Sequence, residues 1–294
     1  MSTKLEYDIE GIILSDIGQH VKSFEPMQKL SCVYAVETEE GKVVMKVAEQ
    51  EHMKSGIRNE IAINMMIQHK VPVPRILSAG FNDGYIIMED AGPDNFYDLW
   101  KKKKAPDELF AEMGRILHEI HSFTFDKPGK FKDGLLADLS ASYSTAAVKN
   151  GKAAVHKLKE HIDDSLNHSI EALFEEGYDD SDDDACLLHF DYHPGQIIVS
   201  DEPHCITGVI DFEIGHVGPP LIDLVRVERF MLGQGPDKRD QFFQGYPKPP
   251  NYESKKRLFL VVELLVFAMV CQQVKDVRGM YKYLHWVPRF VHPD

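Results

Sequence analysis

The chain has 294 residues, 43% of them hydrophobic, and a formal net charge of −14 at pH 7. This length and apolar content are sufficient for one large core or two packed lobes, and the length favours two. The acidic balance argues against a nucleic-acid partner, because phosphate binding requires clustered lysines and arginines, and the basic run 101–104 is short. A cationic small-molecule partner suits this charge without being required by it.

The cysteines and apolar runs indicate the compartment. No two of the four cysteines have the CxxC spacing of a zinc or redox site. The first residues lack the basic start and apolar stretch of a secretion signal. The longest apolar run, residues 258–271, is too short to span a bilayer and contains Glu263, so we expect a buried helix there. These features predict a cytoplasmic protein without membrane contact, and they do not indicate an oligomeric state.

Strand patterns dominate the chain up to about residue 90. Residues 32–38 and 42–47, joined by a Glu-Glu-Gly turn, are typical of a hairpin. Apolar residues at helical spacing predict a helix over 57–68, which the prolines of 71–74 would end. Residues 75–81 and 85–89 predict two further strands with an Asn-Asp-Gly turn between them. The segment 23–31 is expected to be a loop.

Helical patterns dominate after Gly92. They predict a helix over 109–122, one or two helices over 153–176 with a break at 161–167, and packed helices over 221–232 and 258–274. The acidic run 179–184 and the proline-rich run 245–251 are expected to be loops. Strands followed by helices predict an α+β fold.

One segment, residues 187–213, places polar side chains at the ends of apolar runs. Asp191 and Gln196 flank a Pro-Gly turn, and Asp211 follows the apolar pair Val209 and Ile210. Two buried strands flanking a loop would bring these three side chains onto one rim. Such a rim offers one carboxylate that is free to accept a proton. It also offers a carboxylate oxygen and an amide oxygen, which are the ligands that Mg²⁺ bound to a phosphate requires.

The segment resembles the catalytic segment of the aminoglycoside phosphotransferase and choline kinase family, in the runs 189–196 and 210–213. Further runs are similar to this family in the expected order: 44–47, 58–60, 71–74 and 85–90. The resemblance implies a two-lobe protein-kinase-like fold, with an antiparallel-sheet nucleotide-binding lobe at 1–90 and a mainly helical catalytic and acceptor-binding lobe at 91–294. It implies an ATP-dependent O-phosphotransferase that acts on a small molecule.

The resemblance also implies roles for single residues. Asp191 would be the base that deprotonates the acceptor hydroxyl, and Asp211 and Gln196 would hold Mg²⁺. Lys46 would bind the phosphates of ATP and Glu60 would hold Lys46. The other expected nucleotide contacts are Ser31, Cys32, Met88, Glu89 and Ala91. The acceptor pocket is expected in residues 153–178 and 226–252, and an aminoglycoside, a macrolide, a choline-like and a sugar-like acceptor all stay open.

The sequence departs from the family pattern at four places. Gln196 stands where the family has Asn, Phe190 where it has Gly, and Pro219 where it has Asp. The loop 23–31 lacks the glycines that often cover the phosphates. A nucleotide site is therefore expected with altered details around the metal and the phosphates.

Other readings stay open at this stage. His189, Asp191 and His193 alternate and could together hold the zinc ion of a hydrolase. A chain that has lost nucleotide binding would be a kinase-shaped binding module without activity. Taken singly, Lys46 and Glu60 could be surface residues, the two histidines could merely fix the loop, and Asp223 could cap a helix or anchor a loop. Whether Glu213 contacts metal or acceptor is also open.

Overall fold

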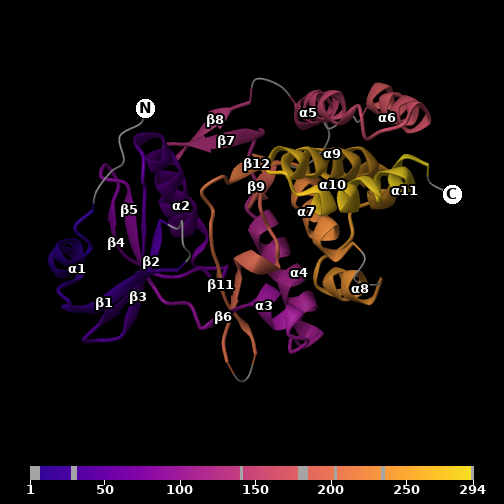
Figure 1. The fold of residues 1–294 in the computed structure, drawn as a ribbon. Coiled ribbons are helices and arrows are strands. Elements are labelled where there is room, and N and C mark those ends of the chain that lie inside the picture. The colour runs from indigo at the N-terminus through magenta and orange to yellow at the C-terminus, as the bar shows by residue number, and fades with distance from the viewer. Residues whose placement is uncertain are drawn as a thin grey trace.

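A computed structural model describes residues 7–27, 32–139, 142–177, 185–201, 204–232 and 236–292. It has a small lobe built on an antiparallel sheet and a larger, mainly helical lobe, which lie side by side in Figure 1. The predicted α+β two-lobe fold is thereby confirmed. The expected boundary between residues 90 and 91 falls just after a strand that ends at Glu89, and it stays a prediction.

The small lobe contains a five-stranded sheet with the order β1-β2-β3-β5-β4. Its strands are β1 (Val21–Pro26), β2 (Val33–Thr38), β3 (Lys42–Val47), β4 (Ile76–Gly80) and β5 (Tyr85–Glu89). The two predicted hairpins, β2 with β3 and β4 with β5, are both present. Strand β1 is a correction, because residues 21–26 pair with β2 where a loop was expected to begin at residue 23.

Two helices accompany this sheet. Helix α1 (Ile9–Ile17) was not predicted, although the Asp8 side chain accepts a hydrogen bond from the Gly11 N–H at its start. Helix α2 (Lys54–Ile67) follows a short 3₁₀ turn (Glu51–Met53) and begins three residues before the predicted 57. Its buried face includes Ile57, Ile61 and Ile63, as the spacing indicated.

The large lobe contains nine helices within the described residues. They are α3 (Phe96–Lys101), α4 (Glu108–His121), α5 (Tyr143–Leu158), α6 (Asp164–Glu176), α7 (Leu221–Met231), α8 (Pro236–Gly245), α9 (Tyr252–Gln273), α10 (Val277–Leu284) and α11 (Val287–Val291). The gap between α5 and α6, residues 159–163, overlaps the predicted break at 161–167 only in part, and α5 begins ten residues earlier than expected. Helices α3, α8, α10 and α11 were not predicted; they have 5 to 10 residues each, and so short an element shows few repeats of a helical pattern.

Short strands of the large lobe form two further sheets. One has the order β11-β10-β6, from β6 (Asp94–Asn95), β10 (Ile197–Val199) and β11 (Ile206–Val209). The other has the order β8-β7-β12-β9, from β7 (Gly129–Lys132), β8 (Leu135–Asp138), β9 (Cys186–Leu188) and β12 (His216–Gly218). The buried strands expected around the 187–213 segment are therefore β9, β10 and β11.

The core of the large lobe surrounds α9, on which Leu260, Val261, Leu264 and Leu265 are fully buried. This confirms that the longest apolar run is a buried helix. No helix of the described ranges is long and apolar enough to cross a membrane. The four cysteines are free thiols in this structure.

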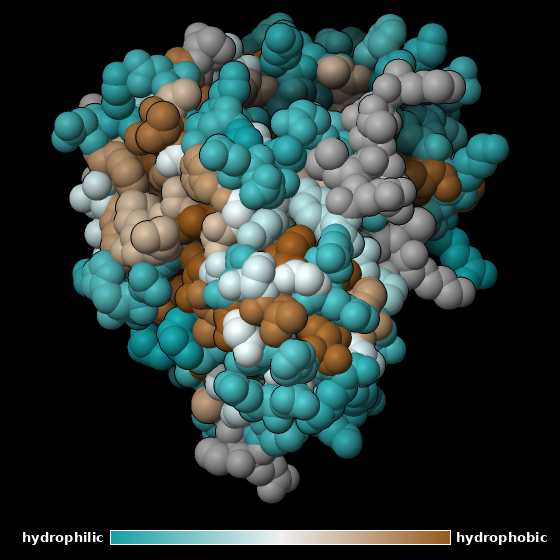
Figure 2. All heavy atoms as spheres, turned by 90° about the vertical axis from the view of Figure 1, so that its left-hand side faces the viewer, coloured by the Kyte–Doolittle hydropathy of each residue, from teal (hydrophilic) through white to brown (hydrophobic). Residues whose placement is uncertain are grey.

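Figure 2 views the small lobe, where hydrophobic residues gather near the centre of a mostly hydrophilic face. Exposed hydrophobic residues of this lobe include Leu14 of α1 and Phe24 of β1. Apolar atoms contribute roughly 55–60% of the accessible surface of a folded protein, so exposed apolar residues are ordinary. Exposure of these side chains therefore does not by itself indicate a binding site.

Candidate active site

A cavity of about 380 Å³ lies between the sheet of the small lobe and β10 and β11 of the large lobe. Its apolar walls come from Cys32, Val33 and Val44 on the sheet and from Ile198 and Ile210 on the opposite side. Residues 88–92, which connect the two lobes after β5, form another wall. The polar residues of the lining are Lys46, Glu60, Glu89, Asp90, Gln196, Asp211 and Glu213.

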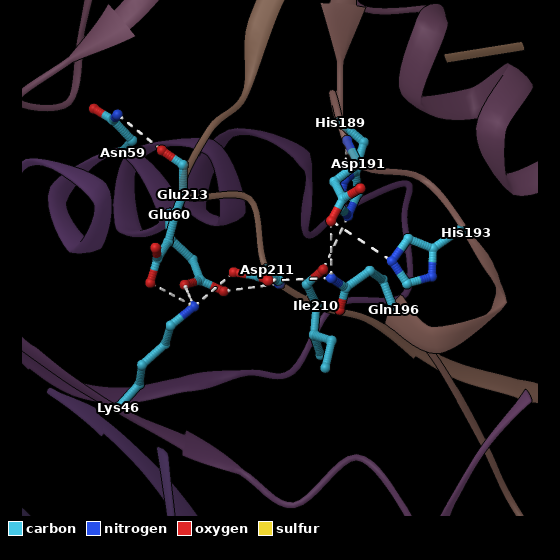
Figure 3. A network of polar contacts seen from close by, with 10 residues as sticks. All are labelled: Lys46, Asn59, Glu60, His189, Asp191, His193, Gln196, Ile210, Asp211 and Glu213. Atoms are coloured by element: carbon cyan, nitrogen blue, oxygen red, sulfur yellow. Dashed lines mark hydrogen bonds and ion pairs between the residues drawn. The ribbon is translucent and has the colours of Figure 1, made fainter. Parts of the chain in front are cut away.

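Lys46 is the centre of a charged cluster in this cavity (Figure 3). Its Nζ atom lies 2.8 Å from Glu60 Oε2, 2.8 Å from Asp211 Oδ1 and 2.7 Å from Glu213 Oε1. The side chain is 9% exposed. Burial opposes the charged ammonium, but the three carboxylates outweigh it and raise the pKa of Lys46 well above its ordinary value. Three negative charges share a single positive one, so the cluster can accept a further cation.

The helix α2 supplies the partner that fixes Lys46. Glu60 is 1% exposed and uses both carboxylate oxygens, because Oε1 accepts the Asp211 backbone N–H at 3.1 Å while Oε2 faces Lys46. The preceding Asn59 donates to the backbone oxygen of Glu213 at 3.0 Å. These contacts join α2 to the segment after β11. Glu60 is therefore a buried link between the lobes and not a surface residue.

The loop that carries Asp191 is held by a buried carboxylate of α7. Asp223 is fully buried, and it accepts the backbone N–H groups of His189 and Phe190, each at 2.8 Å. Its Oδ2 also faces His121 Nε2 at 3.2 Å. The sequence left two roles open for Asp223, a helix cap and a loop anchor. Asp223 lies within the first turn of α7 and does not cap it, so its side chain anchors the loop.

Both ring nitrogens of His189 are engaged inside the protein. Its Nε2 contacts the backbone oxygen of Ile210 at 2.9 Å, and its Nδ1 accepts the Asp191 N–H at 3.3 Å. His193 Nδ1 accepts the Gly195 N–H at 3.0 Å. The zinc hypothesis for these residues is therefore wrong, because His189 has no nitrogen available for a metal. Among the described residues, the group of three that could hold a metal ion is Glu60, Asp211 and Glu213.

Gln196 connects the two aspartates. Its amide Nε2 donates to Asp211 Oδ2 at 3.1 Å and lies 3.4 Å from Asp191 Oδ2 (Figure 3). The backbone of Gln196 also accepts the Ile210 N–H at 3.0 Å, which keeps this loop beside β11. Asp191, Gln196 and Asp211 thus lie along one rim, as the sequence predicted.

The two aspartates remain ionised in this setting. Burial alone would raise the pKa of Asp191, but the hydrogen bond and charge of His193 outweigh it and hold the pKa below its ordinary value. For Asp211 burial is likewise outweighed, chiefly by Lys46, and its pKa is lowered. Burial dominates at Glu213 and raises its pKa despite the Lys46 contact. Asp211 also has φ at 73°, an uncommon backbone conformation of a kind that gathers at functional sites.

The structure brings together most residues that the sequence singled out. Cys32, Lys46, Glu60, Gln196 and Asp211 all line the cavity, and the expected adenine contacts Met88, Glu89 and Ala91 line it too. Ser31 lies outside the described residues. Two contacts were not predicted from the sequence, that of Glu213 with Lys46 and that of Asn59 with Glu213. The Asp-Phe-Glu run and the neighbouring Glu60 were the signals for them.

The oxygen donors around Asp211 fit a magnesium ion. Asp211 and Glu213 present carboxylate oxygens, which hard cations prefer. Gln196 turns its nitrogen toward Asp211, and a half turn of the amide group would present its oxygen instead. The amide group of Gln196 therefore lies within contact distance of Asp211 in spite of its longer side chain.

Comparison with known sequences identifies the family. A family model described as "Phosphotransferase enzyme family" matches residues 29–256, well over half of the chain. The chain belongs to this family, and it is therefore a phosphotransferase. A search of curated proteins found no significant match.

Solved structures show the same fold at low sequence identity. The chain is similar to a mutant of aminoglycoside 2'-phosphotransferase-IIIa in complex with GDP, with 15% identity and a TM-score of 0.69 over 95% of this chain and 94% of that one. It is similar to a thermostable mutant of APH(4)-Ia with ADP and hygromycin B, with 16% identity and a TM-score of 0.69 over 97% and 98% of the two chains. A ternary complex of APH(2")-IIa with streptomycin and ATP gives 17% identity and a TM-score of 0.63 over 98% of both chains.

Proposed function

We propose that this phosphotransferase moves the γ-phosphoryl group of ATP to a hydroxyl group of a small molecule. The observation that carries the proposal is the row formed by Lys46, Asp211, Gln196 and Asp191, of which the first three line the cavity and the fourth contacts Gln196. A phosphate-binding ammonium, metal ligands and a base in this order are what phosphoryl transfer requires. Solved structures of the same fold hold ATP or ADP together with an antibiotic.

The cavity has the character of a nucleotide site. Val44 on one side and Ile198 and Ile210 on the other leave an apolar slot between the lobes, suited to a flat base. Residues 88–91 line its edge, where backbone groups can meet the polar rim of adenine. In this proposal residues 1–90 form the nucleotide-binding domain and residues 91–294 the catalytic and acceptor-binding domain.

Asp191 acts as the base in the proposed mechanism. Its lowered pKa keeps it ionised at neutral pH, so it can accept a hydrogen bond from the acceptor hydroxyl and take its proton as the oxygen attacks phosphorus. His193, whose Nε2 lies 3.6 Å from Asp191 Oδ2, and Gln196 position the carboxylate. Lys46, held by Glu60, neutralises phosphate oxygens.

Asp211, Gln196 and Glu213 would hold Mg²⁺. When bound, the ion neutralises charge on the phosphates of ATP. The protein's contribution is the excess of carboxylates over ammonium groups around Lys46, and this excess favours binding of a divalent cation.

The proposal is tested by transfer of labelled phosphate from ATP across a panel of aminoglycosides, macrolides, amino alcohols and sugars. We expect a labelled product that needs Mg²⁺, disappears with chelator and returns when Mg²⁺ is restored. The variant Asp191→Ala should reduce kcat by about 10²-fold to 10⁴-fold, since a positioned base contributes that much. Turnover that is unaffected by Asp191→Ala would refute the mechanism.

Binding distinguishes the enzyme from a kinase-shaped binding module. With Mg²⁺ and ATP at 100 times the Kd, thermal unfolding should reflect about 2.7 kcal/mol of added stability. The variant Lys46→Met should lose most of this stabilisation. No stabilisation of the wild-type protein, together with no product, would favour the module without activity.

A further inference from the structure

A second cavity lies beside Phe190 of the Asp191 loop and shares no described lining residue with the first cavity. It has a volume of about 250 Å³ and lies between α5, α7 and α9, with His216 of β12 also in its wall. Phe190, the residue directly before Asp191, lines this cavity, whereas Gln196, which contacts Asp191, lines the nucleotide cavity. The short loop with the base therefore contributes residues to both cavities. Under the proposed function, a second substrate site beside this loop is required.

The walls of this second cavity are mainly apolar. They include Tyr143 and Ala147 of α5, Ile222 and Val225 of α7, and Phe259 and Val262 of α9. The volume is below the roughly 300–1,000 Å³ of most ligand sites. A compound with one ring fits such a space better than an antibiotic with several rings.

The charged groups in the wall neutralise one another. Arg226 Nη2 lies 3.2 Å from Glu263 Oε1, and Arg229, which does not line the cavity, places its Nε 3.4 Å from Glu263 Oε2. The carboxylate is thus already shared by two guanidinium groups. Burial lowers the pKa of His216 to about 4, so this imidazole is uncharged at neutral pH. The described lining therefore offers no carboxylate that is not already neutralised for a substrate ammonium group.

Phe190 is an unusual residue for its backbone conformation. Its φ is 66°, in the left-handed region that favours glycine, and glycine is what the family pattern has here. The ring stacks on His216 with centroids 4.0 Å apart, and the Arg226 guanidinium lies 4.3 Å from its centroid. Arg226 also donates to the Phe190 backbone oxygen. A bulky residue kept in this conformation beside the base points to a role in shaping the site.

We propose that the second cavity binds the acceptor, that the acceptor is a small uncharged hydroxyl compound with an apolar ring, and that Phe190 determines the size of the site. This inference rests on the proposed function, because it names the substrate class of the same reaction. An acceptor with several ammonium groups would lose hydration without gaining carboxylate partners. The acceptor pocket was predicted in residues 153–178 and 226–252. Of these residues, only Arg226 is among the described residues that line the second cavity, so the proposed acceptor site differs from the predicted one.

Binding tests this proposal without catalysis. The full-length variant Asp191→Ala is titrated with one-ring alcohols, such as benzyl alcohol and cyclohexylmethanol, and with the matched cation para-aminomethyl benzyl alcohol, by ligand-observed NMR. We expect the neutral alcohols to bind at least about tenfold more tightly than the matched amine. The additional substitution Ala146→Trp at the cavity mouth should abolish binding, and Ala153→Trp, exposed on the same helix, should not. No binding of neutral alcohols, or tighter binding of the amine, overturns the proposal.

Activity of the otherwise unchanged protein completes the test. Ala146→Trp should lower kcat/KM for the neutral alcohol at least about tenfold while leaving the KM for ATP unchanged. Phe190→Gly should raise the KM for one-ring alcohols and admit larger neutral ones. Preferred turnover of kanamycin would refute the substrate class and leave the phosphotransferase function intact. Binding of the alcohol without any phosphoryl transfer would refute the proposed function and leave the binding site intact.

Discussion

The substitution Asp223→Asn tests whether the catalytic loop depends on one buried carboxylate. The wild-type carboxylate accepts the N–H groups of His189 and Phe190, both at 2.8 Å, and is fully buried. An amide of the same shape presents one oxygen and one NH₂ group, so one backbone N–H faces a donor. Hydrogen bonds to charged groups contribute about 1.5–3 kcal/mol each, and we expect a loss of about 3 kcal/mol in the free energy of unfolding.

Urea denaturation measures this loss, and the exposed Asp201→Asn serves as the matched control with a change within about 0.5 kcal/mol. Because the loop carries Asp191, its displacement by about 1 Å should also reduce kcat by about 10²-fold. The pKa of Asp223 is lowered, since His121 outweighs the effect of burial. Its contribution is therefore present above the unfolded pKa of about 3.9 and is lost as the pH falls through the lower folded value. A stability change below about 1 kcal/mol with unchanged kcat for Asp223→Asn would refute this reasoning.

Three further predictions concern other charged groups. Lys46→Met leaves Glu60, Asp211 and Glu213 without their shared cation, so the free energy of unfolding should fall by about 3–5 kcal/mol. Denaturant titration measures this loss, and an unchanged denaturation midpoint would contradict the prediction. The pKa of Asp191 is lowered, so protonation of Asp191 should not reduce kcat/KM of phosphoryl transfer between pH 8 and about pH 5. A fall of kcat/KM near pH 6 that is absent from an Asp191 variant would argue against Asp191 as the base. Burial lowers the pKa of His216 to about 4, so this residue contributes stability above about pH 6.5 that is lost as the pH falls toward 4, by up to about 3 kcal/mol. Denaturation of His216→Asn at both pH values should therefore show a smaller loss of stability on acidification than the wild-type protein. An identical loss in the two proteins would refute this prediction.

Local patterns in the sequence predicted four of the five strands of the small-lobe sheet and most long helices. The hairpin of β2 and β3 is marked by a Glu-Glu-Gly turn, and the buried face of α2 by apolar residues at helical spacing. Elements with weaker periodicity were missed. Strand β1 is an edge strand with mostly exposed residues, so its sequence lacks the apolar alternation that a half-buried strand shows.

The order of the motifs predicted which residues meet in the candidate site. Lys46, Glu60 and Asp211 come from three separate segments of the chain. The runs around them resemble a family in which these segments meet, and this resemblance predicted that the three side chains lie together. Spacing alone could not exclude zinc binding by His189 and His193. That hypothesis failed because His189 uses both ring nitrogens within the fold.

The sequence by itself determined the fold class, the order of the strands and helices that carry the motifs, and the aspartates at the ends of buried strands. Only the tertiary structure decided how charges are shared, because Glu213 contacts Lys46 across 167 positions of sequence and Asp223 anchors a loop more than 30 residues away. It also decided where the second cavity lies, since helices α5, α7 and α9 form its walls from distant segments. Burial and electrostatic pairing depend on which surfaces meet in space, and local periodicity does not specify those contacts.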